Sequence, residues 1–332
     1  MKILRHASAA AARLITSRDA TILCYHGIEQ RGPIDPGSPH VSVARFRDAI
    51  DVACSVAKPV ALRELIERRV AGRSTAGLFA VTFDDAYVSL ADPAVREILH
   101  GGRLPITVFV VSGSSATGLP FWWDRVETVQ RAVAASVWAE FEQAIGIASK
   151  YRTAASISYG PLRPLRQWVL DAHAGRWPRG AEAALSALET RAGVRPAQRP
   201  MTFDELDAFV RTGHVDLGVH TVSHPVLPLL ADAEVSREIK ESHAALIERW
   251  PSTIPWLAVP FGLYDERTSQ LAREAGLEGI LNLHPYPMSQ MSATHGIPRM
   301  NVMENVPAWK LALRLGGLAP VLWRSPAALP FP

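Results

Sequence analysis

A short apolar segment of the chain ends in two adjacent carboxylates. Val81-Thr82-Phe83 runs directly into Asp84-Asp85, the pattern of a buried strand with acids at its carboxyl end. Two neighbouring anions are costly to bury unless a cation lies beside them, because burial disfavours the charged form and like charges repel. The pair therefore predicts a bound metal ion. The alternative is a turn at the strand end with solvated acids.

A pair of histidines far downstream offers matching metal ligands. His220 and His224 are four residues apart, a spacing that on a helix would place both on one face. Such a pair is weak evidence alone in a chain with 11 histidines. Two histidines and one carboxylate, however, leave coordination positions open, as in catalytic zinc sites. A second, unligated carboxylate could then take a proton from metal-bound water, which is the layout of a hydrolase.

Composition and charge exclude some other classes of function. The chain has 332 residues and a formal net charge of +3, and it contains no dense run of Lys or Arg, so nucleic-acid binding is not indicated. No apolar stretch is long enough to span a membrane. The basic N-terminus is interrupted by Arg13 and Arg18 and lacks the apolar core of a secretory signal. We expect a cytoplasmic protein, and peripheral membrane association through an amphipathic N-terminal helix stays open.

The elements that would position the acids and histidines alternate between strands and helices, which favours an α/β barrel or a doubly wound sheet. Helical segments are expected between the strands and again from residue 307, whereas residues 124–197 show helical patterns only. In either fold, active groups gather where parallel strands end. The predicted strands cover residues 21–25, 78–83, 106–111, 215–219, 256–259 and 279–283.

The segments around these strand ends, taken together, resemble the motifs of polysaccharide deacetylases, the carbohydrate esterase family 4 with its NodB homology domain. Residues 81–85 resemble the first motif, residues 218–225 the second and residues 259–265 the third. The Tyr25-His26 segment resembles the opening of a subgroup that acts on bacterial exopolysaccharides, in which the histidine strand lies at the N-terminus.

The resemblance also implies an architecture, a distorted (β/α)7-type barrel with a helical insertion. We expect a helical extension at residues 1–20, a catalytic domain at 21–305 with the insertion at about 124–197, and a C-terminal helix and tail at 306–332.

The resemblance implies a role for each motif residue. Asp85, His220 and His224 would bind a divalent metal, usually zinc, and Asp84 would be the general base that activates the metal-bound water. His26 would be the general acid that protonates the departing amine.

The third motif implies an oxyanion site at the backbone N–H of Phe261. An arginine that often precedes this motif is replaced here by Ala258, and Arg299 is a candidate substitute that would orient the base; a structural or surface role is the alternative. His284 superficially resembles the acid of other family members, in which case His26 would be structural.

Several aromatic and polar residues near the motifs are candidates for substrate contact: Tyr87, Trp122, Trp123, Tyr264 and His284. Tryptophans stack on sugar rings, but two adjacent ones also commonly anchor a helix in a core.

The resemblance implies hydrolysis of an N-acetyl group on an N-acetylhexosamine-containing glycan, in an exopolysaccharide, a cell-envelope polysaccharide or a precursor. One alternative keeps the fold and cleaves an O-acetyl ester or a cyclic amide or ureide. Another is a non-catalytic glycan-binding module with a vestigial site.

Overall fold

The computed structural model describes residues 19–30, 38–147, 163–284 and 296–315. Its centre is a nine-stranded sheet in the order β10-β9-β8-β7-β6-β5-β1-β11, with β4 beside β5, and all of its strand pairs are parallel. The strands are β1 (Thr21–Tyr25), β4 (Lys58–Pro59), β5 (Leu78–Asp84), β6 (Ile106–Val110), β7 (Val215–Val219), β8 (Trp256–Ala258), β9 (Gly279–Asn282), β10 (Ile297–Pro298) and β11 (Met300–Asn301).

The two edges of this sheet meet at one residue. β10 pairs with β9 and β11 pairs with β1, and only Arg299 separates the two short strands. The Arg299 N–H donates to the Asn282 carbonyl at 3.0 Å, and the Val302 N–H donates to the Cys24 carbonyl at 2.9 Å. The sheet therefore closes nearly completely into a barrel, which confirms the barrel prediction and excludes an open doubly wound sheet.

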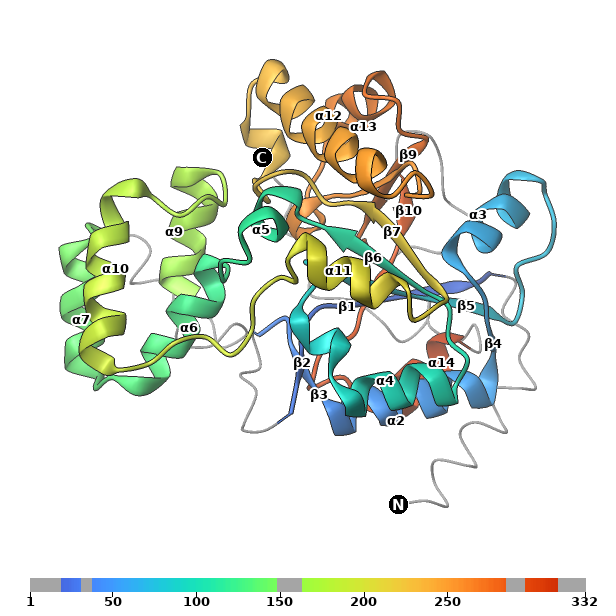
Figure 1. The fold of residues 1–332 in the computed structure, drawn as a ribbon, viewed down its shortest axis with the longest axis horizontal. Coiled ribbons are helices and arrows are strands. Elements are labelled where there is room, and N and C mark those ends of the chain that lie inside the picture. The colour runs from blue at the N-terminus through green and yellow to red at the C-terminus, as the bar shows by residue number, and fades with distance from the viewer. Residues whose placement is uncertain (1–18, 31–37, 148–162, 285–295, 316–332) are drawn as a thin grey trace.

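Helices surround the barrel, and several begin at side-chain caps that the sequence indicates (Figure 1). Asp92 accepts from the Ala94 N–H at 2.8 Å, with Pro93 at the first helical position. Two short parallel strands, β2 (Ile28–Glu29) and β3 (Val41–Ser42), form a separate two-stranded sheet. The surrounding helices are α2 (Val43–Val56), α3 (Leu62–Val70), α4 (Pro93–Gly101), α5 (Ser112–Thr117), α11 (Phe203–Val210), α12 (Asp232–Arg249), α13 (Glu266–Glu274) and α14 (Ala308–Leu315).

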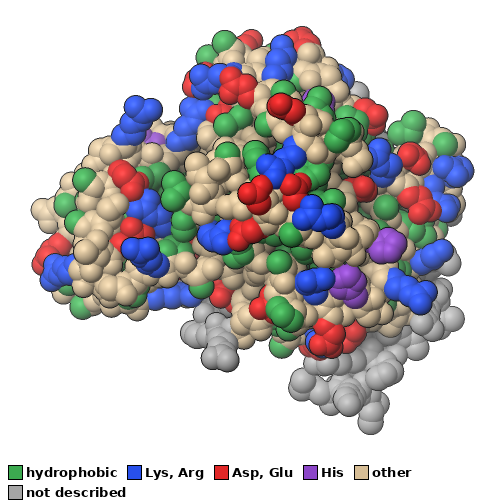
Figure 2. Space-filling view, viewed as in Figure 1, with side chains coloured by type: hydrophobic (Ala, Val, Ile, Leu, Met, Phe, Trp, Pro, Cys, Tyr) green, Lys and Arg blue, Asp and Glu red, His purple; other side chains and the backbone are tan. Residues whose placement is uncertain are grey.

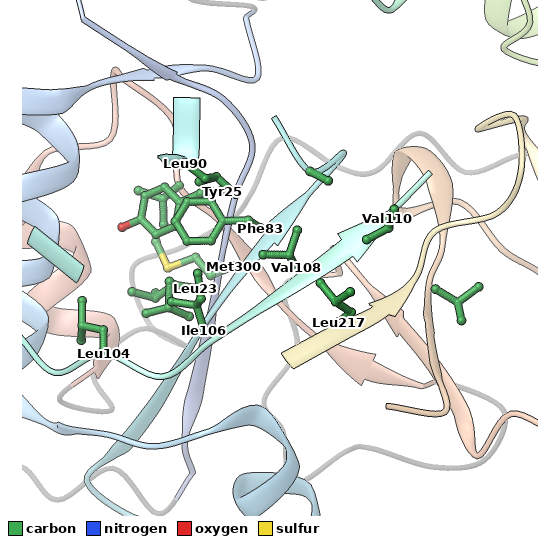
Figure 3. Packing of buried hydrophobic residues seen from close by; sticks show 14 of the residues in the cluster. Leu23, Tyr25, Phe83, Leu90, Leu104, Ile106, Val108, Val110, Leu217 and Met300 are labelled. Carbon is green, nitrogen blue, oxygen red and sulfur yellow. The ribbon is translucent and has the colours of Figure 1, made fainter. Parts of the chain in front are cut away.

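Two apolar clusters occupy the two faces of the sheet. One contains Leu23, Tyr25 and Phe83, which pack with residues of α2, α4 and α14 (Figure 3). The other contains alternate residues such as Ile22 and Ala80, packed with residues of α3. Strands buried on both faces read as continuous apolar runs, which explains why the sequence pattern of β5 is unbroken.

The described residues between α5 and α11 form a helical lobe beside the barrel (Figure 1). Its described elements are α6 (Trp122–Ala132), α7 (Ala135–Ala144), α9 (Arg163–His173) and α10 (Arg179–Ala192). The lobe has its own apolar cluster, which includes Trp138, Leu165 and Leu185. The chain is extended at Val133 and Ala134, which separates α6 from α7. The helix expected at residues 7–15 lies outside the described residues.

Acidic and basic side chains are interspersed over the face shown in Figure 2. Among the described residues, no helix has both the length and the hydropathy needed to cross a bilayer. The last described helix, α14, packs on α2 instead, with Leu311 and Leu315 buried.

One tightly packed position on β7 gives a test of the fold. A Cβ at Gly218 would lie 2.5 Å from Cε1 of the buried Phe109 ring. We expect Gly218→Ala to destabilise the protein by about 1–3 kcal/mol through overpacking. The matched control is Gly180→Ala, in helix α10 with no atom within 4 Å of the added Cβ, which should be neutral or slightly stabilising. Chemical denaturation measures both, and equal midpoints would contradict this packing.

Candidate active site

The carboxyl ends of the parallel strands meet around one pocket. His26 follows β1, Asp85 follows β5 and His220 follows β7. The strand order places these ends together, as expected for active groups in an α/β barrel. The pocket is lined by His26, Pro39, Asp84, Asp85, Trp122, Trp123, Arg166, Leu170, His220, His224, Phe261, Gly262 and Leu283.

Three side chains in this pocket present metal-ligating atoms to one another. Asp85 Oδ1 lies 3.6 Å from Nε2 of His220 and 3.6 Å from Nε2 of His224. Tetrahedral ligands at zinc-ligand distances of about 2.0–2.2 Å are themselves about 3.3–3.6 Å apart, so the spacing fits such an ion. His220 Nδ1–H donates to the Ala258 carbonyl at 2.7 Å, which leaves Nε2 as the ligating atom.

The electrostatics of these three residues also favour a cation. Burial raises the pKa of the Asp85 carboxyl well above its usual range, and the charge of Asp84 adds to this effect. Burial lowers the pKa of both His220 and His224, so both imidazoles are neutral. Asp85 Oδ1 and His220 Nε2 are buried and have no hydrogen-bond partner among the described residues. Neutral imidazoles, a carboxylate and unpartnered ligand atoms are the donor set that zinc takes in proteins.

The two histidines are brought together by a loop and not by a helix. Thr221 and His224 have φ angles of 67° and 56°, in the left-handed region that non-glycine residues rarely adopt. The His224 N–H donates to Oγ1 of Thr221 at 3.0 Å and closes the turn. The helical geometry considered for this pair is therefore wrong, although the pair does converge on one point.

The neighbouring carboxylate, Asp84, is held by a buried arginine. Arg299 donates from Nη1 to Oδ1 at 2.6 Å and from Nη2 to Oδ2 at 2.8 Å, and its side chain is fully buried. Burial alone would raise the pKa of the Asp84 carboxyl, but the Arg299 charge outweighs this and holds the pKa well below its usual range. Arg299 Nη1 also lies 3.3 Å from Oγ1 of Thr82. Arg299 was considered either as the residue that orients the base or as a structural or surface residue. This geometry agrees with the first role.

The two candidate acids occupy different places. His26 lines the pocket, and its ring lies within 4.8 Å of an Asp84 oxygen and of Cys24 Sγ. Burial lowers the pKa of His26 to about 4, although the charge of Asp84 acts to raise it. His284 is outside the pocket lining and packs against Tyr264, with ring centroids 5.5 Å apart.

The aromatic candidates also differ in whether they line the pocket. Trp122 and Trp123 line the pocket, and the Phe261 ring packs edge-on against His224 at 4.5 Å between centroids. Tyr87 is fully buried behind the pocket, where it donates to Asp124 at 2.9 Å and accepts from Trp123 Nε1 at 2.8 Å. A residue so enclosed cannot contact substrate, which corrects the expectation for Tyr87.

The sequence missed residues that the insertion and loops contribute to the pocket. Arg166 and Leu170 come from α9 in the helical insertion, and Pro39 and Leu283 come from loops beside β3 and β9. None of these belongs to a recognisable motif. Helical periodicity could have found α9, but only the packing of the insertion against the barrel brings its side chains to the pocket.

Comparisons with known proteins agree with this arrangement. Residues 172–280 match the family model described as polysaccharide deacetylase, a segment that contains His220, His224 and Phe261. A relative, chitin deacetylase 2 of Saccharomyces cerevisiae, is 27% identical over 118 residues, covering 35% of this chain and 36% of that protein. The chain therefore matches only about a third of the length of that relative.

Solved structures share the fold over most of the chain. Deacetylase PplD of Streptococcus pyogenes, in complex with acetate, has a TM-score of 0.58 at 16% identity and covers 90% of this chain and 97% of its own. IcaB from Ammonifex degensii has a TM-score of 0.55 at 16% identity, covering 91% and 98%. A de-N-acetylase from Aggregatibacter actinomycetemcomitans has a TM-score of 0.51 at 12% identity, covering 87% and 96%. The chain thus shares its barrel fold with solved deacetylase structures, and residues 172–280 are similar to the polysaccharide deacetylase family model.

Proposed function

We propose that this protein is a metal-dependent hydrolase that removes N-acetyl groups from an N-acetylhexosamine-containing glycan. The glycan would be an exopolysaccharide, a cell-envelope polysaccharide or its precursor. The observation that carries the proposal is the convergence, in one pocket, of the ligand set Asp85, His220 and His224 beside Asp84, which is paired with Arg299. The fold neighbours include a de-N-acetylase and a deacetylase solved with acetate, which supports this class of bond.

Asp85, His220 and His224 would hold a divalent metal, and this donor set favours zinc. When bound, such an ion supplies Lewis acidity and lowers the pKa of water. Asp84 pairs through both oxygens with Arg299, whereas Oδ1 of Asp85 faces Nε2 of both histidines. The division of roles between the adjacent acids thus follows from their partners.

Asp84 would accept a proton from the attacking water while the water oxygen forms a bond to the acetyl carbon. Because the Arg299 charge holds the pKa of Asp84 low, the protonated carboxyl would readily give up this proton. His26 is neutral at pH 7 with a pKa of about 4, and it would relay the proton to the departing nitrogen as the C–N bond breaks. The products are acetate and a free amine, so the proton taken from water ends on the nitrogen.

The pocket walls would orient the sugar. Trp122 and Trp123 offer aromatic faces, and the Phe261 backbone, with a φ angle of 58°, turns the third motif toward the histidines. A backbone N–H at Phe261 would stabilise the developing oxyanion. Trp122 is the better candidate for sugar stacking, because it is partly exposed while Trp123 is buried.

Metal removal tests the ligand set. A chelator should abolish acetate release from an N-acetylglucosamine oligomer, and added zinc should restore it. The double variant Asp85→Ala, His220→Ala should lose bound zinc by elemental analysis, because two of three ligands are gone, while His284→Ala should keep it. Unchanged zinc in the double variant would rule out this metal site. Faster release from O-acetylated xylan oligomers would favour the esterase alternative.

Replacing the base tests the mechanism separately from metal binding. Asp84→Asn preserves shape but removes the proton acceptor, so acetate release should fall by about 10²–10⁴-fold with zinc content retained. The control is Asp51→Asn, on the exposed side of α2, which should match wild type. Equal activity in Asp84→Asn and wild type would contradict the role of Asp84 as the general base.

The two candidate acids can be separated by matched substitutions. His26→Ala should lower kcat by about 10²–10⁴-fold through loss of the proton relay. His284→Ala should leave kcat close to wild type, because His284 is outside the pocket lining. The reverse pattern in steady-state kinetics would transfer the acid role to His284.

A further inference from the structure

The loop between the two histidines adopts a conformation that it would not hold alone. The stretch Thr221–His224 contains two non-glycine residues in the left-handed region, at φ angles of 67° and 56°. Such residues persist only where surrounding contacts over-determine the backbone. The contacts that fix this loop therefore also fix where the His224 ring points.

A buried carboxylate from α12 supplies several of these contacts. Glu238 is 3% exposed, and its Oε2 accepts the backbone N–H groups of Val222 at 3.0 Å and Ser223 at 2.8 Å. Its other oxygen, Oε1, accepts from the Ser223 hydroxyl at 2.6 Å. Hydrogen bonds to an ionised acceptor are stronger than neutral ones, so this carboxylate strongly restrains the loop.

The opposite side of the loop is held by the start of α5. The Ser112 N–H donates to the Thr221 carbonyl at 3.1 Å, and the Gly113 N–H donates to the Val222 carbonyl at 3.0 Å. A Cβ at Gly113 would lie 2.7 Å from that Val222 oxygen, so the two segments are in close contact. The amide side of the loop thus depends on Glu238 and the carbonyl side on α5.

Glu238 is in turn held by the helical insertion. Arg176, in the turn between α9 and α10, donates from Nη2 to Glu238 Oε1 at 2.9 Å and from Nη1 to Glu234 at 3.2 Å. The preceding residue of the same turn, Gly175, accepts from Trp122 Nε1 at 2.9 Å. The Ala174 carbonyl accepts the Val226 N–H at 2.7 Å, just beyond the histidine loop. This turn, residues 174–176, therefore joins the insertion to the loop.

We propose that Glu238 and Arg176 are positioning residues for His224, so that the insertion is a working part of the metal site. This proposal rests on the metal binding proposed above. Arg176 fixes the position of the Glu238 carboxylate. The carboxylate fixes the backbone amides of Val222 and Ser223, and these amides fix the orientation of the adjacent His224. Residues that orient ligands without touching the ion are known to tune metal affinity.

The test compares variants of the two positioning residues with a control on α12. Glu238→Gln should lower zinc affinity by about 10-fold or more, measured by chelator competition on the metal-free protein. Arg176→Met should lower it in the same direction, and Arg176→Lys, which keeps the charge, should recover part of the loss. The matched control is Glu234→Gln, one turn away on α12, which also contacts Arg176 but not the loop and should bind zinc like wild type.

Thermal unfolding of the metal-free variants separates positioning from general stability. Unchanged zinc affinity in Glu238→Gln and Arg176→Met, with lower unfolding midpoints, would show a purely structural pair and overturn the proposal. If Glu238→Gln does not fold, Arg176→Met and Ser223→Ala at more exposed positions give the same comparison. Zinc binding by wild type with no acetate release would instead count against the proposed function and leave this inference standing. No zinc uptake by wild type would overturn both.

Discussion

Two adjacent buried carboxylates are the constraint around which the site is arranged. Asp84 and Asp85 are each 2% exposed, and neither could remain ionised in so dry an environment without compensation. Arg299 compensates Asp84 through two hydrogen bonds, whereas Asp85 faces two neutral histidines and no cation of the described chain bonds to it. The asymmetry gives the two acids different chemistry although they are neighbours in sequence.

The same arginine lies at the closure of the barrel. Arg299 separates β10 from β11, so its backbone joins the two edges of the sheet while its side chain points at Asp84. The guanidinium also lies over the Phe109 ring, 5.3 Å from its centroid. Barrel closure and the charge state of the candidate base therefore depend on one residue, which couples the integrity of the fold to the electrostatics of the pocket.

The helical insertion contributes side chains to the pocket and hydrogen bonds to the loops around it. α9 contributes Arg166 and Leu170 to the pocket wall, and the turn at 174–176 bonds to Glu238 and to the chain beyond the histidine loop. Buried hydrogen bonds hold the start of α6 in place. Trp123 donates to Tyr87, Tyr87 donates to Asp124, and Asp124 also bonds to His40 at 2.8 Å. The insertion has its own apolar cluster, and it contacts the barrel through a second cluster, in which Phe121 and Trp123 pack with Tyr87 and Val111, as well as through these hydrogen bonds.

The sequence by itself determined the alternating strands and helices, because these depend on local patterns of apolar and polar residues. The choice of a barrel and the motif residues at the strand ends came from the resemblance to polysaccharide deacetylases. His26, Asp84, Asp85, His220 and His224 all line the pocket as expected. Tertiary structure alone decided that Arg299 pairs with Asp84, that Tyr87 is enclosed and that Glu238 and Arg176 hold the histidine loop. These are contacts between residues far apart in the chain, for example 215 positions between Arg299 and Asp84, and no local pattern encodes them.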